Sequence, residues 1–302
     1  MSSIAYVTDE KMIEYHRLCG AREMNFWRLS SKKDFTDFRK GDLLFFYAKA
    51  PHARRKGFVG YAHYVSTRKL SLHQMWKKYH TLNGYDSEQK LSEAIHRAAK
   101  DRPVPEQMNC LYLNDAVFFN VPVDPREAGI SISENLESYM YLDQEDAQTT
   151  VRILRKAEES GIDLWSASQS FEPENVFRSD EIRHQLTLIH STIGPSGWNA
   201  RERSRAVKLA RDASESSDWE YIRGSRTDLV RIRKEELEIA LPFTAQTKDR
   251  PVRVQEYLGR VFLYREMLME SGLRITAVRF TALYEEAPED VLSYLKAANY
   301  EK

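Results

Sequence analysis

The sequence predicts a two-domain protein in which an α+β domain precedes an α/β domain. Three observations support this prediction: the length of 302 residues, a change in the order of strand and helix patterns near the middle, and a Ser- and Pro-containing link over 166–179. A chain of this length exceeds the usual size of one domain. We therefore expect a first domain at 1–165 and a second domain at 166–302.

The composition is typical of a globular protein, with 42% hydrophobic and 11% aromatic residues. No apolar run approaches the length of a membrane helix and no signal peptide opens the chain, so we expect a cytoplasmic protein without a membrane partner. Cys19 and Cys110 lack the spacing of metal ligands, which favours reduced, buried thiols. No glycine-rich cofactor loop is present, and this argues against a fused methyltransferase.

Positive charge is concentrated in one segment, although the formal net charge of the chain is zero. Residues 32–78 contain twelve Lys or Arg and three Asp, an excess of nine positive charges. Such a patch favours a polyanionic partner, and the alternative is a solvated face. Aromatic residues are interleaved with the basic ones, which favours nucleic acid.

The elements of the first domain follow from apolar patterns and punctuating residues. Asp9 is placed to cap a short helix that ends near Leu18. A basic loop at 51–57 separates two strands, and Gly161 is a fitting end for the last helix. The predicted strands are 25–28, 43–47, 58–65 and 110–119, and the predicted helices are 9–18, 70–79, 87–98 and 144–160.

The order of motifs in this half resembles the EVE-type, PUA-like domains that precede HNH-type modification-dependent restriction enzymes. The motifs are an aromatic-Trp pair ending at Trp27, a Lys-Gly-Asp turn ending at Asp42, a Phe-rich strand, Leu70-Ser with Trp76 and Asn83-Gly, and the Asp115-Ala-Val-Phe-Phe stretch. The resemblance covers about residues 24–145 and implies a β-barrel with helices that accepts an extruded, modified base. No paired-His signature of an HNH nuclease follows in 150–302.

The resemblance implies a pocket with aromatic walls and polar groups at its edge. For each aromatic residue the alternative is ordinary core packing, and for Asp42 it is a structural turn. A solvated loop is the alternative for the phosphate-binding set. The candidate base-binding residues are Trp27, Asp42, Phe46, Tyr47, Tyr61 and Trp76, and the candidate phosphate-binding residues are Arg54, Arg55 and Lys56.

The second half reads helix, helix, strand, strand, helix, strand, helix. Short β-branched runs flank a charged turn at 233–236, which predicts two adjacent antiparallel strands. Pro288 is placed near the first turn of the last helix. The predicted helices are 181–190, 200–213, 254–265 and 288–295, and the predicted strands are 229–232, 237–241 and 276–283.

This order resembles the core of PD-(D/E)xK nucleases over about residues 200–302. Asp228 matches the first acid and Glu238 the second, but the Lys position holds Ala240 and the helix Gln position holds Arg260. The resemblance implies a restriction-endonuclease-like mixed-sheet domain whose catalytic residues are Asp228, Glu238 and position 240. Glu202 on the preceding helix is a candidate further acid, with Glu181 as second choice and a surface glutamate as the alternative.

Together the two resemblances imply a modification-dependent endonuclease that cuts double-stranded DNA with Mg²⁺ or Mn²⁺ held by Asp228 and Glu238. Ala240 leaves three alternatives: the lysine role has moved, with Lys248 nearest, the chain is inactive, or the natural lysine was replaced. The alternative class is a nucleic-acid-binding module with an inactive nuclease fold, and a weaker one is an RNA-associated protein. A homodimer is the default for restriction nucleases.

The geometry of the two carboxylates separates these alternatives. A metal site requires Asp228 and Glu238 to share one edge of the sheet with the Cβ of Ala240. If the two carboxylates point to opposite faces, the nuclease hypothesis fails and the binding module replaces it.

Overall fold

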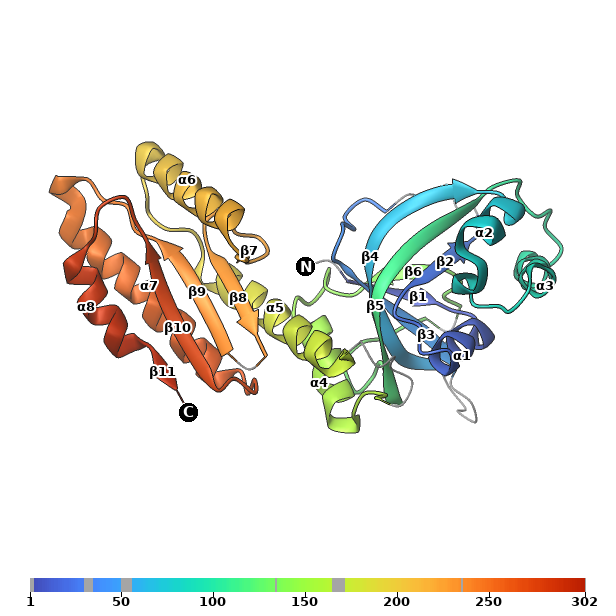
Figure 1. Cartoon of the computed structure of the whole chain (residues 1–302). Coiled ribbons are helices and arrows are strands. Elements are labelled where there is room, and N and C mark those ends of the chain that lie inside the picture. The colour runs from blue at the N-terminus through green and yellow to red at the C-terminus, as the bar shows by residue number, and fades with distance from the viewer. Residues whose placement is uncertain are drawn as a thin grey trace. The chain divides into compact units, whose positions relative to one another are not determined.

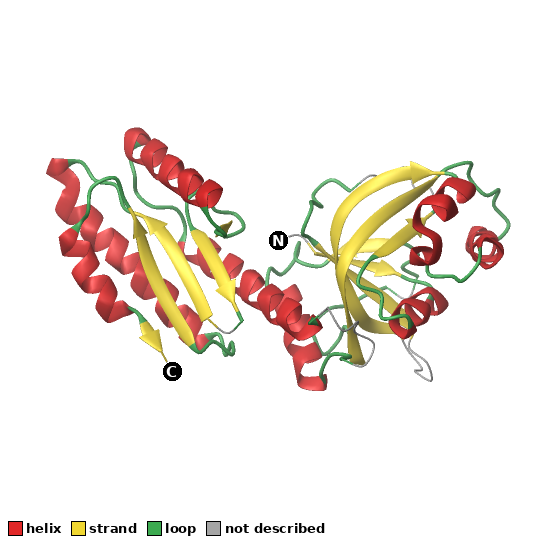
Figure 2. Ribbon diagram, in the orientation of Figure 1, coloured by secondary structure: helices red, strands yellow, loops and turns green. Residues whose placement is uncertain are grey.

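The structure is a computed structural model that describes residues 3–29, 35–49, 56–133, 135–164, 172–234 and 236–301. The chain divides into two compact units, Met1–Phe177 and Arg178–Lys302. Both units combine helices with a mixed sheet, as the colouring by secondary structure shows (Figure 2). The mixed α and β content expected from the sequence is therefore confirmed.

The first unit is built on a six-stranded mixed sheet in the order β2-β5-β4-β3-β1-β6 (Figure 1). β1 runs parallel to β3, and the other neighbours are antiparallel. The strands are β1 (Ser3–Val7), β2 (Met24–Arg28), β3 (Leu43–Lys49), β4 (Lys56–Leu70), β5 (Met108–Val123) and β6 (Tyr139–Tyr141). The helices are α1 (Glu10–Leu18), α2 (Leu72–Tyr79), η1 (His80–Asn83), α3 (Glu88–Ala99) and α4 (Thr149–Ser160).

The predicted closed β-barrel is not present in the described part of this unit. β2 and β6 are the two ends of the strand order, and no hydrogen-bonded ladder joins them among the described residues. β4 and β5 are long and strongly curved (Figure 1), which brings the ends of the sheet toward each other without closing it. Side chains still meet there, since the rings of Tyr6 and Phe26 lie 4.9 Å apart.

Alternating residues of β3 pack into two separate cores. Leu44 and Phe46 lie on the face covered by α1, α2 and α3, whereas Phe45 lies on the face covered by α4 and Phe177. Both faces are buried, which explains why this strand is a continuous apolar run. The sequence pattern predicts such a strand but not which core each ring enters.

Local signals set the helix ends in this unit as expected. The Asp9 carboxylate accepts a hydrogen bond from the Lys11 N–H at 2.8 Å and caps α1. Gly161 ends α4 with a φ of 79°, a conformation that favours glycine. β1 was not predicted, because its five residues form a run too short to identify without their partners in β3 and β6.

The second unit is a five-stranded mixed sheet in the order β11-β10-β9-β8-β7. The strands are β7 (Glu220–Tyr221), β8 (Leu229–Arg233), β9 (Glu236–Pro242), β10 (Ala277–Leu283) and β11 (Tyr300–Glu301). The helices are α5 (Pro173–Ile193), whose first five residues belong to the first unit, α6 (Ala200–Ser216), η2 (Thr247–Asp249), α7 (Arg250–Glu270) and α8 (Glu289–Ala298). α5 and α7 have 21 residues each, and among the described residues no helix is long and apolar enough to cross a membrane.

The two faces of this sheet carry different helices. Val230, Ile239 and Phe280 pack with residues of α5, α7 and α8 in the larger core. Leu229 and Ala240 pack instead with Ala210 of α6 in a small core. The register pairs Leu229 with Ala240 and Arg231 with Glu238, so these four residues share the α6 face.

Candidate functional site

A cavity of about 840 Å³ opens in the first unit between the two ends of the sheet. β1, β2, α1 and the segment that leads into β6 contribute to its wall. Its size is within the range of pockets that enclose small organic ligands. The lining residues are Tyr6, Val7, Thr8, Asp9, Met12, Phe26, Trp27, Arg28, Leu29, Lys56, Ala98, Lys100, Arg102, Asn135, Leu136, Glu137 and Ser138, and we call this cavity the Trp27 pocket.

Two neighbouring residues of β2 that line the pocket carry buried hydrogen-bond donors. Trp27 is 8% exposed and Arg28 is 5% exposed. The Trp27 Nε1 and the Arg28 Nε and Nη1 have no hydrogen-bond partner among the residues that the structure describes. The Arg28 guanidinium lies 4.4 Å from the centre of the Phe35 ring, a contact that holds its plane without using these donors.

Buried donors of this kind are unfavourable unless something accepts from them. An unsatisfied buried group costs about 1–3 kcal/mol, and more if it is charged. Native proteins therefore leave few of them, and those that remain call for an explanation. At the Trp27 pocket, an acceptor-rich ligand would supply the missing partners.

The rim of the pocket is predominantly basic. Arg28, Lys56, Lys100 and Arg102 line it, against the acids Asp9 and Glu137. Asp9 caps α1, and Glu137 lies 3.8 Å from Lys100. The other described basic residues of the segment 32–78 are exposed, namely Arg39, Lys40, Lys49, Arg68, Lys69, Lys77 and Lys78.

Of the candidate base-binding residues, Trp27 lines the pocket and the others do not. Phe46 and Tyr61 are fully buried. Phe46 stacks with Phe26 and Phe118, and Tyr61 packs on Phe45 in the core below α4. The expectation that these two rings form pocket walls is corrected, since core packing leaves them no open face.

The other three candidates also make contacts that serve the fold, namely Tyr47, Trp76 and Asp42. Tyr47 packs against Phe58 in the α4-side core, and Trp76 packs against the other core beside His80. The Asp42 carboxylate accepts from the Arg39 N–H at 2.6 Å, which fits the turn role weighed as its alternative. Lys56 lines the pocket, whereas Arg54 and Arg55 lie outside the described residues.

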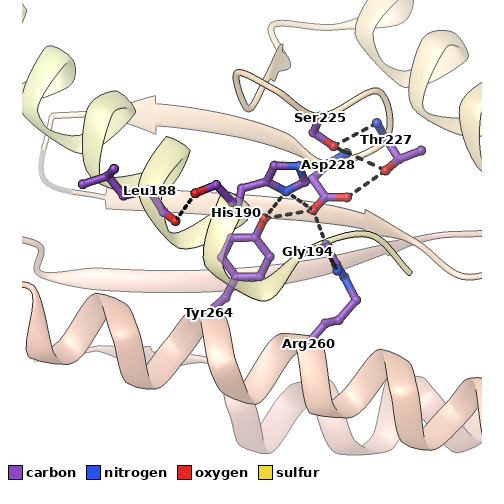
Figure 3. Close-up of polar contacts among 9 residues, drawn as sticks. Leu188, His190, Gly194, Ser225, Thr227, Asp228, Arg260 and Tyr264 are labelled. Atoms are coloured by element: carbon purple, nitrogen blue, oxygen red, sulfur yellow. Dashed lines mark hydrogen bonds and ion pairs between the residues drawn. The ribbon is translucent and has the colours of Figure 1, made fainter. Parts of the chain in front are cut away.

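Asp228, directly before β8, is the centre of a second buried polar cluster, in the other unit (Figure 3). Its Oδ2 accepts from the Arg260 Nη2 at 2.6 Å and from the Tyr264 hydroxyl at 2.9 Å, and lies 3.2 Å from the His190 Nδ1. Its Oδ1 accepts from the Thr227 hydroxyl at 2.9 Å. We call Asp228, His190, Arg260 and Tyr264 the Asp228 cluster.

These contacts keep Asp228 charged despite its burial. Burial alone would raise the pKa of this carboxyl, but the His190 hydrogen bond and the Arg260 charge outweigh burial and lower the pKa to about 2. Burial and the neighbouring carboxylate raise the pKa of Tyr264, so the phenol remains a donor. The cluster joins α5, β8 and α7 through one satisfied carboxylate.

Glu238 does not share a face with Asp228, which corrects the predicted metal pair. Glu238 lies opposite Arg231 in the register, and its carboxylate pairs with that guanidinium on the α6 face. Asp228 instead points at α5 and α7 on the other face. Side chains along a strand alternate between the two faces of the sheet. Asp228 lies three positions before Arg231, the register partner of Glu238, and an odd separation places the two acids on opposite faces.

Ala240 is likewise unlike a catalytic position. It is fully buried against Ala210 of α6 and Leu229, so a longer side chain has no room. On the face of Asp228, β9 presents Ile239 and Leu241, which belong to the larger apolar core. β9 therefore supplies no second carboxylate beside Asp228.

Glu202 and Lys248 do not complete a metal site either. Glu202 is buried, accepts from the Asn199 N–H at 3.0 Å as part of a capping box, and pairs with Arg253 at 2.9 Å. Burial opposes ionisation of Glu202, but the Asn199 N–H and Arg253 outweigh burial and lower its pKa. Lys248 is exposed in η2.

The donor set around Asp228 does not fit Mg²⁺ or Mn²⁺. Divalent cations need several free oxygen ligands, whereas both oxygens of Asp228 already accept from Arg260, Tyr264 and Thr227. A cavity beside this pair measures about 10 Å³, room for about one water molecule. Among the described residues, no group of three or more His, Cys, Asp or Glu is arranged to hold a metal.

Several residues of both sites were not predicted from the sequence. His190 has no sequence-local partner, and its contact with Asp228 spans 38 positions. Arg260 was noted only as a departure from a motif, although a positive charge there is a signal that could have indicated a partner for a buried acid. Arg28 adjoins the predicted Trp27, but a basic residue on a short strand gives no signal of burial.

Comparisons with known proteins identify no family for this chain. No family model matches it, and no curated protein matches it. Solved structures of the ASCH protein from Zymomonas mobilis, in unmodified and variant form, are similar at 12–13% identity with TM-scores of 0.34–0.36. They cover 49–50% of this chain and 93–97% of their own. Identities and TM-scores this low do not indicate a function for this chain.

Proposed function

We propose that this protein binds nucleic acid and takes one base into the Trp27 pocket, and that its second unit is a non-catalytic module. The observation that supports the first part is the set of buried donors on Trp27 and Arg28 that no described residue satisfies. Nucleobases and phosphates are rich in hydrogen-bond acceptors, which these donors require. None of these three donors forms a hydrogen bond with a described residue.

The remaining wall of the pocket fits a planar, partly apolar ligand. Phe26, Trp27, Leu29 and Met12 give it apolar surface, and an extruded base is commonly held between such side chains. The volume of about 840 Å³ leaves room for the sugar and a substituent on the base. These features support a base reader, with modified duplex DNA as the ligand we propose.

The basic rim supports a backbone contact outside the pocket. Lys56, Lys100 and Arg102 line its edge, and further exposed Lys and Arg residues lie in the same unit. Contacts of this kind give affinity that does not depend on sequence and that falls as salt increases. We therefore expect binding to have a general electrostatic part and a specific part that depends on Trp27.

A binding measurement with a matched variant tests this proposal. Fluorescence anisotropy would compare duplex DNA with and without one methylated or hydroxymethylated cytosine, together with single-stranded RNA. Trp27→Phe removes the Nε1 donor and keeps an aromatic ring, so we expect about five- to tenfold weaker binding of the preferred duplex. Trp76→Phe is the control, because Trp76 lies outside the pocket.

The outcomes separate the alternatives. Unchanged binding by Trp27→Phe, or equal loss with Trp76→Phe, would exclude the pocket as the binding site. Preference for RNA over both duplexes would favour an RNA-binding protein. Loss of thermal stability in Trp27→Phe comparable to its loss of binding would mean that Nε1 serves the fold.

The second unit is proposed as a non-catalytic module because Asp228 and Glu238 lie on opposite faces and the Arg260 guanidinium occupies the carboxylate of Asp228. Incubation of supercoiled and modified linear DNA with the chain and Mg²⁺ or Mn²⁺ should leave the DNA intact. Cleavage that EDTA abolishes and that Asp228→Asn also abolishes would restore the nuclease hypothesis.

A further inference from the structure

Helix α7 carries an apolar stripe on its outer surface. Val252, Phe262, Leu263 and Met269 are 45–61% exposed, and all four lie on this helix. Large apolar side chains gathered on one element of a small unit indicate an interaction surface rather than scattered exposure.

The stripe follows the spacing of a coiled-coil seam. Positions 252, 255, 259, 262, 266 and 269 alternate by three and four residues, and they are Val, Gln, Gly, Phe, Glu and Met. The core-facing residues Tyr257, Arg260, Val261, Tyr264 and Leu268 occupy the opposite side of the helix. The seam therefore points directly away from the core of its own unit.

The seams of two α7 helices are complementary when the helices run antiparallel. In an antiparallel pair of such helices, each a position meets a d position of the partner at the same height. The layers are then Val252 with Met269, Gln255 with Glu266 and Gly259 with Phe262, each formed twice. We propose that this seam joins two copies of the chain into a symmetric dimer through antiparallel packing of α7.

The central layer explains an otherwise unfavourable residue. Glycine within a helix costs about 1 kcal/mol relative to alanine. A Cβ added at Gly259 would have no atom within 4 Å, so no contact inside its own chain requires glycine there. In the dimer, the Phe262 ring of each copy fills the space above Gly259 of the other copy.

The outer layers support the same partner. Val252 and Met269 are apolar and flexible enough to fill the ends of the seam. In the intermediate layer, the Gln255 amide can donate to the Glu266 carboxylate of the other copy, which favours one register. Leu263, which flanks the seam, adds apolar area beside this layer.

The size of the seam sets the expected strength of association. It spans 18 residues, about 27 Å of helix. One helix pair of this length lies at the low end of specific interfaces, so we expect a dissociation constant in the micromolar range.

A size swap on the full-length chain tests the proposal. Sedimentation equilibrium from about 1 to 200 μM should show reversible dimerisation, weakened at least tenfold by Gly259→Leu and by Phe262→Ala alone. The combined variant places Leu against Ala, so it should return to within about threefold of the original dissociation constant. Tyr294→Ala removes an exposed aromatic of α8 that is outside the seam, and it should change nothing.

Several results would overturn the proposal. One is a chain that remains monomeric throughout this range. Another is a dimer that is insensitive to both single variants, which would place the interface elsewhere. A drop in unfolding temperature of Phe262→Ala without a change in association would mean that the stripe is covered within its own chain.

Discussion

The Trp27 pocket and the Asp228 cluster are both buried and polar, but they differ in what their polar atoms lack. At the Trp27 pocket, three donor nitrogens on Trp27 and Arg28 have no partner among the described residues, and both residues line a large cavity. In the Asp228 cluster, both carboxylate oxygens are satisfied by neighbouring side chains, and the adjoining cavity holds about one water molecule.

The difference indicates which buried polar groups serve a ligand and which serve the fold. A satisfied network stabilises the native state because every group has exchanged water for protein. An unsatisfied group destabilises the native state and persists where function requires it. Perturbed ionisation alone would have pointed to Asp228, whereas unsatisfied donors on residues that line a large cavity point to Trp27 and Arg28.

Removal of Asp228 should have the largest effect on stability. In Asp228→Ala, Arg260 and His190 lose their buried partner, and we expect the free energy of unfolding in urea to fall by about 4 kcal/mol. Glu238→Ala should cost less than about 1 kcal/mol, because its partner Arg231 also pairs with Asp218. Similar losses in the two variants would contradict the asymmetry between the two acids.

Restoring the motif lysine should destabilise the second unit without creating a nuclease. Ala240→Lys forces a long charged side chain under α6, at a cost of about 3 kcal/mol in the free energy of unfolding. Thr281→Lys is the matched control, since Thr281 adjoins Ala240 in the register but is exposed. A stable Ala240→Lys variant that cuts DNA with Mg²⁺ would refute the opposite-face argument.

Acid should weaken the Asp228 cluster over a defined range of pH. The folded-state pKa of Asp228, about 2, lies below its ordinary value near 4, so its contribution to stability is present above pH 4. That contribution, about 2 kcal/mol, should be lost as pH falls from 4 to 2. Urea titrations at each pH should show this slope, and Asp228→Asn should lack this component of it.

Removal of Arg28 should have the smallest effect on stability, and its main effect should be on binding. Arg28→Met deletes two unsatisfied donors, so we expect the free energy of unfolding to stay the same or to rise by up to about 1 kcal/mol. Affinity for the preferred duplex should fall about tenfold. Arg22→Met is the control, because Arg22 pairs with Asp115 at 2.7 Å and lies outside the pocket. A clear loss of stability in Arg28→Met would mean that the guanidinium serves the fold.

The sequence predicts most helices and strands of both units because their signals are local. Each signal is contained in a few consecutive residues, as for the Asp9 cap, Gly161 and the apolar runs of β3, β8 and β9. What it does not predict is the pairing of distant strands. β1 has partners at 43–47 and 139–141, and whether a sheet closes depends on curvature accumulated over β4 and β5.

The candidate site could be predicted only in part for a related reason. The sequence identifies Trp27, which lines the pocket. It does not distinguish aromatic residues that line a pocket from those that face a core, so the prediction that Phe46 and Tyr61 line the pocket is wrong. Asp228 and Glu238 were paired because their spacing suits adjacent strands. A one-residue shift in register reverses the face of a side chain, and the turn at 233–236 does not define that register from sequence.

The pairing of β1 with β6 has a consequence for synthesis of the chain. Ile4 has Tyr141 as its partner, and residues 135–138 line the Trp27 pocket. At a ribosomal rate of about 5–20 residues per second, β6 is therefore synthesised about 7 to 27 seconds after β1, with which it pairs. The Trp27 pocket is complete only when that neighbour has emerged, so its open edge is exposed to the cell for most of the time that the first unit is being made.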